Sequence, residues 1–359
     1  MATKFSNLKK LTSKNFTVFE NESFTFSDQL NVVVGANGTG KTHLLKLVYS
    51  ILCSIADPGN PTSDPKPTKR YLQRAVASKL QAVFRPDHLG RLIRRSPGRG
   101  RCDVTAIISK RKSVSFSFNS TSKTEVTIDR IPTMWLEGDP IYLPTRELIT
   151  LMPTFVSLYE TQVIPFDETY RDTCVLLGSP ALRGPRSQEI NEILAPIEKL
   201  IGGKVETDKS GRFFVRTSSG NLEMPLVAEG HRKLATIARL VATGHLVGGS
   251  HLIWDEPEAN MNPAVVKQIA KAVLQLCQSE VQVFIATHSV FLLRELDILM
   301  QTEAFKDIAG RFFGLNQTEE GIEVQQGDNA DDIGKIVSLQ EELHQADRYL
   351  GCEEIDADN

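Results

Sequence analysis

The feature that most constrains the fold is a glycine-rich segment between an apolar run and a helical pattern. Val32, Val33 and Val34 precede the sequence Gly-Ala-Asn-Gly-Thr-Gly-Lys-Thr at 35–42, which has the spacing G-x-x-x-x-G-K-[ST]. After it, apolar residues recur at helical spacing as far as Leu52. A buried strand, a tight turn and a helix in this order predict a phosphate-binding loop.

The residue types in this loop suit a nucleotide. Glycine allows successive backbone N–H groups to turn toward a phosphate, and the start of the helix adds the positive end of its dipole. We expect Lys41 to reach the β- and γ-phosphates and Thr42 to bind Mg²⁺. A turn that only joins strand to helix is the alternative, and the strand and helix context favours nucleotide binding. The expected nucleotide-binding residues are Gly35, Asn37, Gly38, Thr39, Gly40, Lys41, Thr42 and His43.

Length and composition indicate a globular chain with a large core. It has 359 residues, of which 41% are hydrophobic, enough for two or three domain-sized units or one domain with an insertion. No apolar run approaches the roughly 18 residues that span a bilayer, so we expect a cytoplasmic protein with no membrane partner. The five cysteines are scattered, which favours reduced thiols over a disulfide framework or a zinc site.

The net charge of −3 hides two segments of opposite charge. Fourteen Lys or Arg and two acidic residues lie between Lys66 and Lys112, whereas Glu341 to Asn359 holds seven acidic residues and one arginine. The basic segment suits either a nucleic-acid backbone, DNA or RNA, or an acidic protein surface, and both alternatives stay open. The candidate residues of this patch are Arg91, Arg94, Arg95, Arg99 and Arg101.

Local patterns predict the remaining elements. Two short alternating stretches, 16–19 and 23–26, predict a β-hairpin before the glycine-rich loop, and a proline-rich linker follows at 57–68. Helical spacing over 69–92 is followed by three strand-like runs, a helical region and two hairpins. The strand-like runs are 103–109, 113–118 and 124–128, the helical region is 166–201, and the hairpin turns lie at 209–211 and 219–221.

Two carboxylates in the second half of the chain follow a buried strand. Leu252, Ile253 and Trp254 precede Asp255 and Glu256, so this strand would deliver both side chains to the C-terminal edge of a parallel sheet, where open α/β sheets bind ligands. We expect the first carboxylate to hold Mg²⁺. The second would act as a general base that polarises the water attacking the γ-phosphate.

A histidine follows another apolar strand, at 281–287. His288 lies 32 positions after Glu256. A lone histidine at such a place is often a structural residue, but its order after the loop and the carboxylates predicts contact with the γ-phosphate. The expected catalytic residues are therefore Glu256 and His288.

This order of motifs resembles that of ATP-binding-cassette (ABC) ATPases. The sequence Asp-Glu-Pro-Glu-Ala-Asn-Met-Asn-Pro at 255–263 is similar to the D-E-P-E-x-x-L-x-P form of the soluble RecF, SMC and OLD classes. The resemblance covers 15–55 and 222–300. It implies an α/β fold, a P-loop ATPase head with an antiparallel β subdomain and a helical, basic insertion, which binds ATP and Mg²⁺ and hydrolyses ATP.

The resemblance also implies a homodimer or higher oligomer of ATPase heads arranged head to tail. Glu229, Gly230 and His231 would then contact the γ-phosphate held by the partner, and Asn260 would lie on a loop that crosses the interface. The serine of the family's signature falls on Ala228, so the hydroxyl contact is missing. Slow or partner-gated hydrolysis is the expected consequence.

Four segments follow from these motifs. Residues 1–56 would form an N-terminal ATPase lobe with the phosphate-binding loop, and 57–221 an insertion with the basic helix and loop, a β-meander and a helical lid. Residues 222–300 would form a C-terminal ATPase lobe with the signature, the acidic pair and the histidine. Residues 301–359 would add strands, a helix and an acidic tail.

Two functions fit this reading. Compact D-E-P-E ATPases of the Septu, retron-associated and PARIS systems are similar, which implies a regulatory or sensor subunit of a bacterial antiviral defence complex that controls a separate nuclease or toxin. The alternative is a RecF-like repair or recombination ATPase that clamps DNA, which the basic segment would suit. The Pro257–Glu258 continuation disfavours a transporter cassette.

Overall fold

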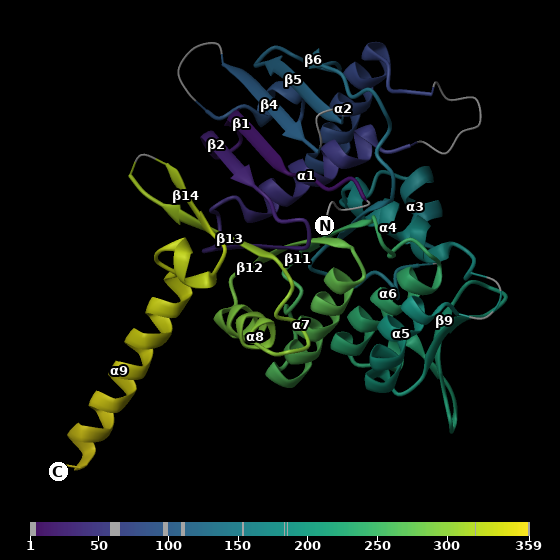
Figure 1. Ribbon diagram of the computed structural model, residues 1–359, viewed down its shortest axis with the longest axis vertical. Coiled ribbons are helices and arrows are strands. Elements are labelled where there is room, and N and C mark those ends of the chain that lie inside the picture. Colours follow the sequence, from purple (N-terminus) through teal and green to yellow (C-terminus); the bar gives the residue numbers. More distant parts are fainter. Residues whose placement is uncertain are drawn as a thin grey trace.

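Three β-sheets and the helices around them form the part of the chain that the computed structural model describes (Figure 1). The described residues are 5–57, 65–95, 100–108, 112–152, 154–182, 184, 186–319 and 321–357. The predicted α/β class is confirmed.

The central sheet has six strands in the order β14-β13-β3-β12-β11-β7. They are β3 (Leu30–Gly35), β7 (Pro140–Leu143), β11 (His251–Asp255), β12 (Gln282–Thr287), β13 (Gly310–Gln317) and β14 (Ile322–Gly327). All neighbours pair in parallel except β14, which is antiparallel to β13. The register places Thr287 beside Val34 and Asp255 beside Ala286, so β3, β12 and β11 end at one edge.

Helices cover both faces of this sheet. They are α1 (Lys41–Ile55), α2 (Lys69–Phe84), α3 (Phe155–Thr161), α4 (Glu168–Gly178), α5 (Gln188–Ile201), α6 (Glu229–Ala242), α7 (Pro263–Gln278), α8 (Val290–Met300) and α9 (Val337–Ala357). Because successive strand side chains point to opposite faces, Val32 and Val34 pack in the core with α4 to α8, while Val33 packs with α1 and α2. The near-continuous apolar sequence of β3 reflects burial on both faces.

A five-stranded antiparallel sheet lies over α1 and α2 (Figure 1). It contains β1 (Lys10–Phe16), β2 (Phe19–Thr25), β4 (Arg101–Ile107), β5 (Ser113–Asn119) and β6 (Thr127–Arg130), in the order β2-β1-β4-β5-β6. The predicted meander is confirmed. Its first strand pairs with β1, so residues from both sides of the proline-rich linker share one sheet.

The N-terminal hairpin forms, but its predicted first strand was wrong. The chain turns inside 16–19, where Thr17 has a φ of 49°, and the strand instead occupies the largely polar Lys10–Phe16. Phe16 and Phe19 pair across this turn, and both are fully buried. Pairing of β1 with β4, a contact between distant segments, therefore outweighs the local alternation of the sequence.

A polar network fastens α2 and α4 to α1. Lys79 on α2 forms ion pairs with Glu168 at 2.8 Å and Asp172 at 3.0 Å, both on α4. The hydroxyl of Tyr49 on α1 donates to Asp172 at 2.8 Å. This network links the segment after the linker to the helix that follows the glycine-rich loop.

The remaining elements lie at the periphery. The two predicted hairpins form a sheet of β8 (Lys204–Thr207), β9 (Phe213–Thr217) and β10 (Gly220–Glu223), and three short 3₁₀ helices join other elements: η1 (Leu89–Leu92), η2 (Met224–Leu226) and η3 (Ala330–Ile333). Helix α9 extends away from the body toward the C-terminus (Figure 1). No helix in the described ranges has the length and hydropathy that a membrane span requires. Cys53, Cys102, Cys174 and Cys277 are free thiols.

Candidate nucleotide-binding site

The glycine-rich loop connects β3 to α1 and is shaped for an anion. Gly40 has a φ of 96°, and a Cβ there would lie 2.5 Å from Val18 Cγ2, so both backbone and space require glycine. No side chain caps the start of α1, which leaves the first N–H groups of the helix available. The predicted strand–loop–helix context of the phosphate-binding loop is therefore present.

Lys41 is buried and folded over this loop. Its Nζ donates to the carbonyl oxygens of Gly35 at 2.8 Å and Ala36 at 3.2 Å. Asn37 and Gly38 are exposed at the tip of the loop. The ammonium group of Lys41 therefore lies beside the loop, where the oxygens of a bound phosphate could replace the two carbonyl oxygens as its hydrogen-bond acceptors.

His43, the last predicted nucleotide-binding residue, faces away from solvent. Its ring centroid lies 5.8 Å from that of Phe84, and its Nδ1 is buried without a partner among the described residues. Burial, helped by nearby Lys46, lowers the pKa of His43. The imidazole packs against Phe84 of α2, and its contact with a nucleotide stays a prediction.

Thr42 and Asp255, the residues predicted to hold Mg²⁺, lie within hydrogen-bond distance of each other at the ends of α1 and β11. Thr42 Oγ1 donates to Asp255 Oδ2 at 2.8 Å, and the hydroxyl of Tyr142 donates to the same oxygen at 3.2 Å. Asp255 Oδ1 is buried and has no donor among the described residues, and burial raises the pKa of Asp255. A buried carboxylate oxygen without a donor, next to a hydroxyl, fits a hard cation such as Mg²⁺.

Glu256 and His288 meet at the ends of β11 and β12. Glu256 Oε2 lies 2.6 Å from His288 Nδ1, and Glu256 Oε1 lies 3.4 Å from Lys41 Nζ. Glu256 has a φ of 50°, an unusual backbone conformation for a residue with a side chain. This strained turn directs the predicted base toward both the lysine of the loop and the predicted γ-phosphate residue.

Glu258 belongs to the same group of side chains, although we assigned it no role from the sequence. Only 8% of it is exposed, and its Oε1 accepts a hydrogen bond from Thr287 Oγ1 at 2.5 Å. Burial, together with the neighbouring carboxylate of Glu256, raises the pKa of Glu258 to about 7. The sequence did contain a signal for Glu258, since it is the last acid of the D-E-P-E sequence. Its closeness to Glu256, however, results from the conformation of the turn after β11.

The predicted signature residues lie in the first turn of α6. Gly230 is packed against α7, and a Cβ there would lie 2.8 Å from Val265 Cγ1. Glu229 Oε1 accepts a hydrogen bond from Asn260 Nδ2 at 3.2 Å, and Ala228 caps the helix without a side-chain hydrogen bond. Within the described ranges, no hydrogen bond or ion pair joins 229–231 to the glycine-rich loop of the same chain. Their contact with a partner's phosphate stays a prediction.

Lys233 is a second residue that sequence reasoning missed. It is 3% exposed, and its Nζ donates to the backbone carbonyls of Ala259 at 2.9 Å and Pro257 at 3.3 Å. Burial lowers the pKa of Lys233. This lysine fixes the loop after the acidic pair to the signature helix, and nothing in its sequence context distinguishes it from a surface lysine.

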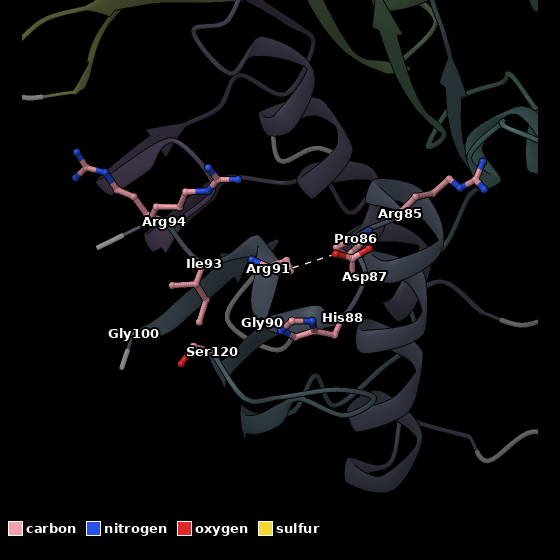
Figure 2. A pocket seen from close by; sticks show the side chains of 11 residues that line it. Arg85, Pro86, Asp87, His88, Gly90, Arg91, Ile93, Arg94, Gly100 and Ser120 are labelled. Atoms are coloured by element: carbon pink, nitrogen blue, oxygen red, sulfur yellow. Dashed lines mark ion pairs between the residues drawn. The ribbon is translucent and has the colours of Figure 1, made fainter. Parts of the chain in front are cut away.

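The basic patch surrounds a hollow of about 660 Å³ at the end of α2 (Figure 2). Its lining includes an arginine and a histidine that the sequence analysis did not single out, Arg85 and His88. The figure shows Arg85 extending away from the hollow and Arg91 paired with Asp87, at 3.9 Å.

Acidic residues from other segments offset part of the charge of this patch. Arg94 forms an ion pair with Glu20, and Arg101 forms one with Asp103 at 2.9 Å. Arg99 lies outside the described residues. The charge counted along the sequence therefore overstates the local positive charge.

Comparisons with known proteins agree with this geometry. Residues 141–294 match a family described as "AAA domain, putative AbiEii toxin, Type IV TA system", and residues 10–134 match a family described as "AAA domain". No curated protein matches the chain.

Two solved structures share the fold. One is an SmcHead bound to the C-winged helix domain of ScpA, at 13% identity, with a TM-score of 0.54, covering 90% of this chain and 98% of that one. The other is an Smc head domain with an extended coiled coil, bound to the C-terminal domain of ScpA derived from Pyrococcus furiosus, at 13% identity, with a TM-score of 0.51, covering 98% and 99%. Both matching family models are described as AAA domains, and the chain shares its fold with these Smc heads. These findings agree with the fold that the resemblance to ABC-type ATPases implied.

Glu258 makes the stability of the protein depend on pH. Its pKa is 4.5 as a free side chain and about 7 in the fold, so between these values the folded state binds more protons than the unfolded state. The free energy of unfolding should therefore fall by about 1–3 kcal/mol as the pH rises through this range. Urea unfolding at a series of pH values, in EDTA, measures the slope.

Glu258→Gln cannot ionise and should flatten this part of the profile. Glu341→Gln, which changes an exposed acid of α9, should leave the slope as it is in the parent protein. An unchanged slope in Glu258→Gln would show that the carboxyl of Glu258 ionises in the folded protein as readily as in the unfolded chain.

Proposed function

We propose that this chain binds ATP with Mg²⁺ and hydrolyses it at a site that a second copy completes. The observation that carries the proposal is the meeting of five functional side chains at one edge of the central sheet. These are Lys41, Thr42, Asp255, Glu256 and His288, which come from the starts and ends of α1, β11 and β12.

Each of these side chains has a task that follows from its position. Lys41 exchanges its two carbonyl partners for the β- and γ-phosphates, and Thr42 and Asp255 hold Mg²⁺, which neutralises developing charge on the phosphates. Glu256 accepts hydrogen bonds from the attacking water and aligns it with the γ-phosphate. His288 orients Glu256 through the contact of its Nδ1 with Glu256 Oε2, and its partly exposed ring can face the γ-phosphate.

Lys41 and Glu256 separate ATP binding from hydrolysis. Lys41→Ala removes the charge that meets the phosphates, so ATP binding should fall below detection in calorimetry. Glu256→Gln keeps the size of the side chain but cannot act as a base. It should retain ATP affinity, lose at least about 100-fold in turnover and accumulate an ATP-bound dimer in native mass spectrometry. Parental turnover by Glu256→Gln would remove Glu256 as the base.

Ala228 offers a test of the site's second half. If Glu229, Gly230 and His231 of a second copy close over the γ-phosphate, a hydroxyl at Ala228 would add one hydrogen bond to a charged group. Ala228→Ser should then raise turnover by about tenfold. The matched control is Ala242→Ser, at the opposite end of α6, which should not change turnover. Equal turnover of parent, Ala228→Ser and Ala242→Ser would place the signature away from the phosphate.

For the cellular role, we propose a cytoplasmic regulatory subunit of a bacterial antiviral defence complex, in which slow or partner-gated ATP turnover controls a separate nuclease or toxin. The D-E-P-E sequence and the family description that names a putative AbiEii toxin and a Type IV TA system support this role. Native mass spectrometry of the chain isolated from its host, with and without ATP, tests it. A stable nuclease or toxin subunit supports the role, and an ATP-dependent homodimer alone opposes it.

The second candidate is a RecF-like ATPase that clamps DNA during repair or recombination. It is favoured by the arginine-lined hollow beside α2, because arginine side chains suit phosphate oxygens.

Replacing the patch arginines tests this candidate. The variant changes Arg94, Arg95, Arg99 and Arg101 to Gln. The control changes Lys199, Lys267, Lys271 and Lys306 to Gln, an equal loss of charge elsewhere in the chain. If the patch binds DNA, the arginine variant should lose affinity in fluorescence anisotropy and its salt slope should fall by about 1 per lost phosphate contact. Equal binding by both variants would leave the patch to an acidic protein surface.

A further inference from the structure

Three potential metal ligands meet at the end of β12, outside the Thr42–Asp255 pair. A carboxylate oxygen of Glu256, one of Glu258 and a ring nitrogen of His288 all lie within 4.8 Å of one another. The first two belong to the turn after β11, and the histidine follows β12, so the parallel pairing of these strands sets the spacing. Two carboxylates and an imidazole are a common ligand set for first-row divalent metals.

One of these ligands, Glu258, has a buried carboxylate oxygen without a hydrogen-bond donor among the described residues. This oxygen is Oε2, and the residue is 8% exposed. The carboxylate of Glu256 lies beside Glu258 and has no proton to donate when ionised, while the ammonium of the buried Lys233, which also interacts with both carboxylates, donates to backbone carbonyls. A buried oxygen that faces another acceptor is costly unless a cation or a proton lies between them.

The cluster borders a hollow at the surface. The side chain of His288 is 54% exposed, whereas that of Glu256 is 15% exposed. A hollow of about 630 Å³ borders Glu258 and His288 and extends to Glu341 and Arg348 on α9. A cation can therefore approach Glu258 and His288 from this hollow, and the third ligand atom, on Glu256, lies within 4.8 Å of theirs.

We propose that Glu256, Glu258 and His288 form a binding site for Zn²⁺, separate from the Mg²⁺ site of Thr42 and Asp255. The imidazole favours Zn²⁺ over Mg²⁺, which prefers oxygen ligands and keeps most of its waters. Three protein ligands with an open fourth position match the composition of a zinc site that exchanges with solvent.

The consequence is regulatory, and this part rests on the proposed ATPase function. Glu256 and His288 cannot both coordinate Zn²⁺ and engage the attacking water and the γ-phosphate. Zinc bound to the nucleotide-free protein would hold the general base away from its substrate. Glu258, which has no assigned step in hydrolysis, would then serve as the ligand that makes the resting state stable.

Calorimetric titration of the nucleotide-free chain with ZnSO₄, after EDTA treatment and dialysis, tests the site. We expect one zinc per chain at this site, and Glu258→Gln and His288→Ala should each weaken binding by at least about tenfold. Thr42→Val, which alters the Mg²⁺ pair, and Glu341→Gln, which alters the far wall of the same hollow, should bind zinc like the parent protein.

Co²⁺ in place of Zn²⁺ reports the ligands directly. The proposal expects visible absorption bands of a nitrogen- and oxygen-ligated ion, without the intense ultraviolet bands of a cysteine thiolate, and loss of these bands in His288→Ala. Circular dichroism melting of each variant shows whether it is folded. Zinc affinity that is the same in Glu258→Gln, His288→Ala and the parent, or thiolate bands in the cobalt spectrum, would overturn the site.

ATP turnover at increasing Zn²⁺, with Mg²⁺ in excess, tests the regulatory step. Zinc should inhibit the parent protein at lower concentration than it inhibits Glu258→Gln, whose site lacks one ligand. Equal inhibition of the two would overturn the regulatory step. Because the binding titrations contain no nucleotide, loss of the zinc site is distinguishable from failure of the proposed ATPase function.

Discussion

The site depends on the parallel pairing of β3, β12 and β11. Their register brings Val34 beside Thr287 and Ala286 beside Asp255, so the glycine-rich loop, the histidine and the acidic pair leave the sheet at one edge. Burial of both faces holds this register, because a shift of one residue would exchange the side chains of the two cores. The functional geometry is therefore a consequence of the core packing that holds these strands in register.

Several carboxylates lie close together at this edge of the sheet. They belong to Asp255, Glu256 and Glu258, and the lysines near them are Lys41 and the buried Lys233. Burial raises the pKa of Asp255 and of Glu258, which shows that the fold destabilises their ionised forms. Such clusters are typical of sites that bind cations, since a metal supplies the charge that the protein omits.

Much of the fold could be predicted from local patterns, and the failures have a common cause. The loop at 35–42, the strand before Asp255 and the meander were predicted because period and turn residues specify them locally. The strand Lys10–Phe16 was missed because its polar sequence becomes a strand only by pairing with β4. Arg99, one of the predicted patch residues, lies outside the described part of the chain.

The sequence by itself determined the order and the chemistry of the site. The spacing of Gly35 and Lys41, and the acids that end an apolar run, fix which residues can hold a nucleotide and a metal. Only the tertiary structure decided that Glu258 faces Glu256 and that Lys233 holds the loop after them. The first contact depends on the conformation of the turn after β11, where Glu256 has a φ of 50°, and the second joins α6 to that turn. Neither the turn conformation nor the helix packing is encoded by a local sequence pattern.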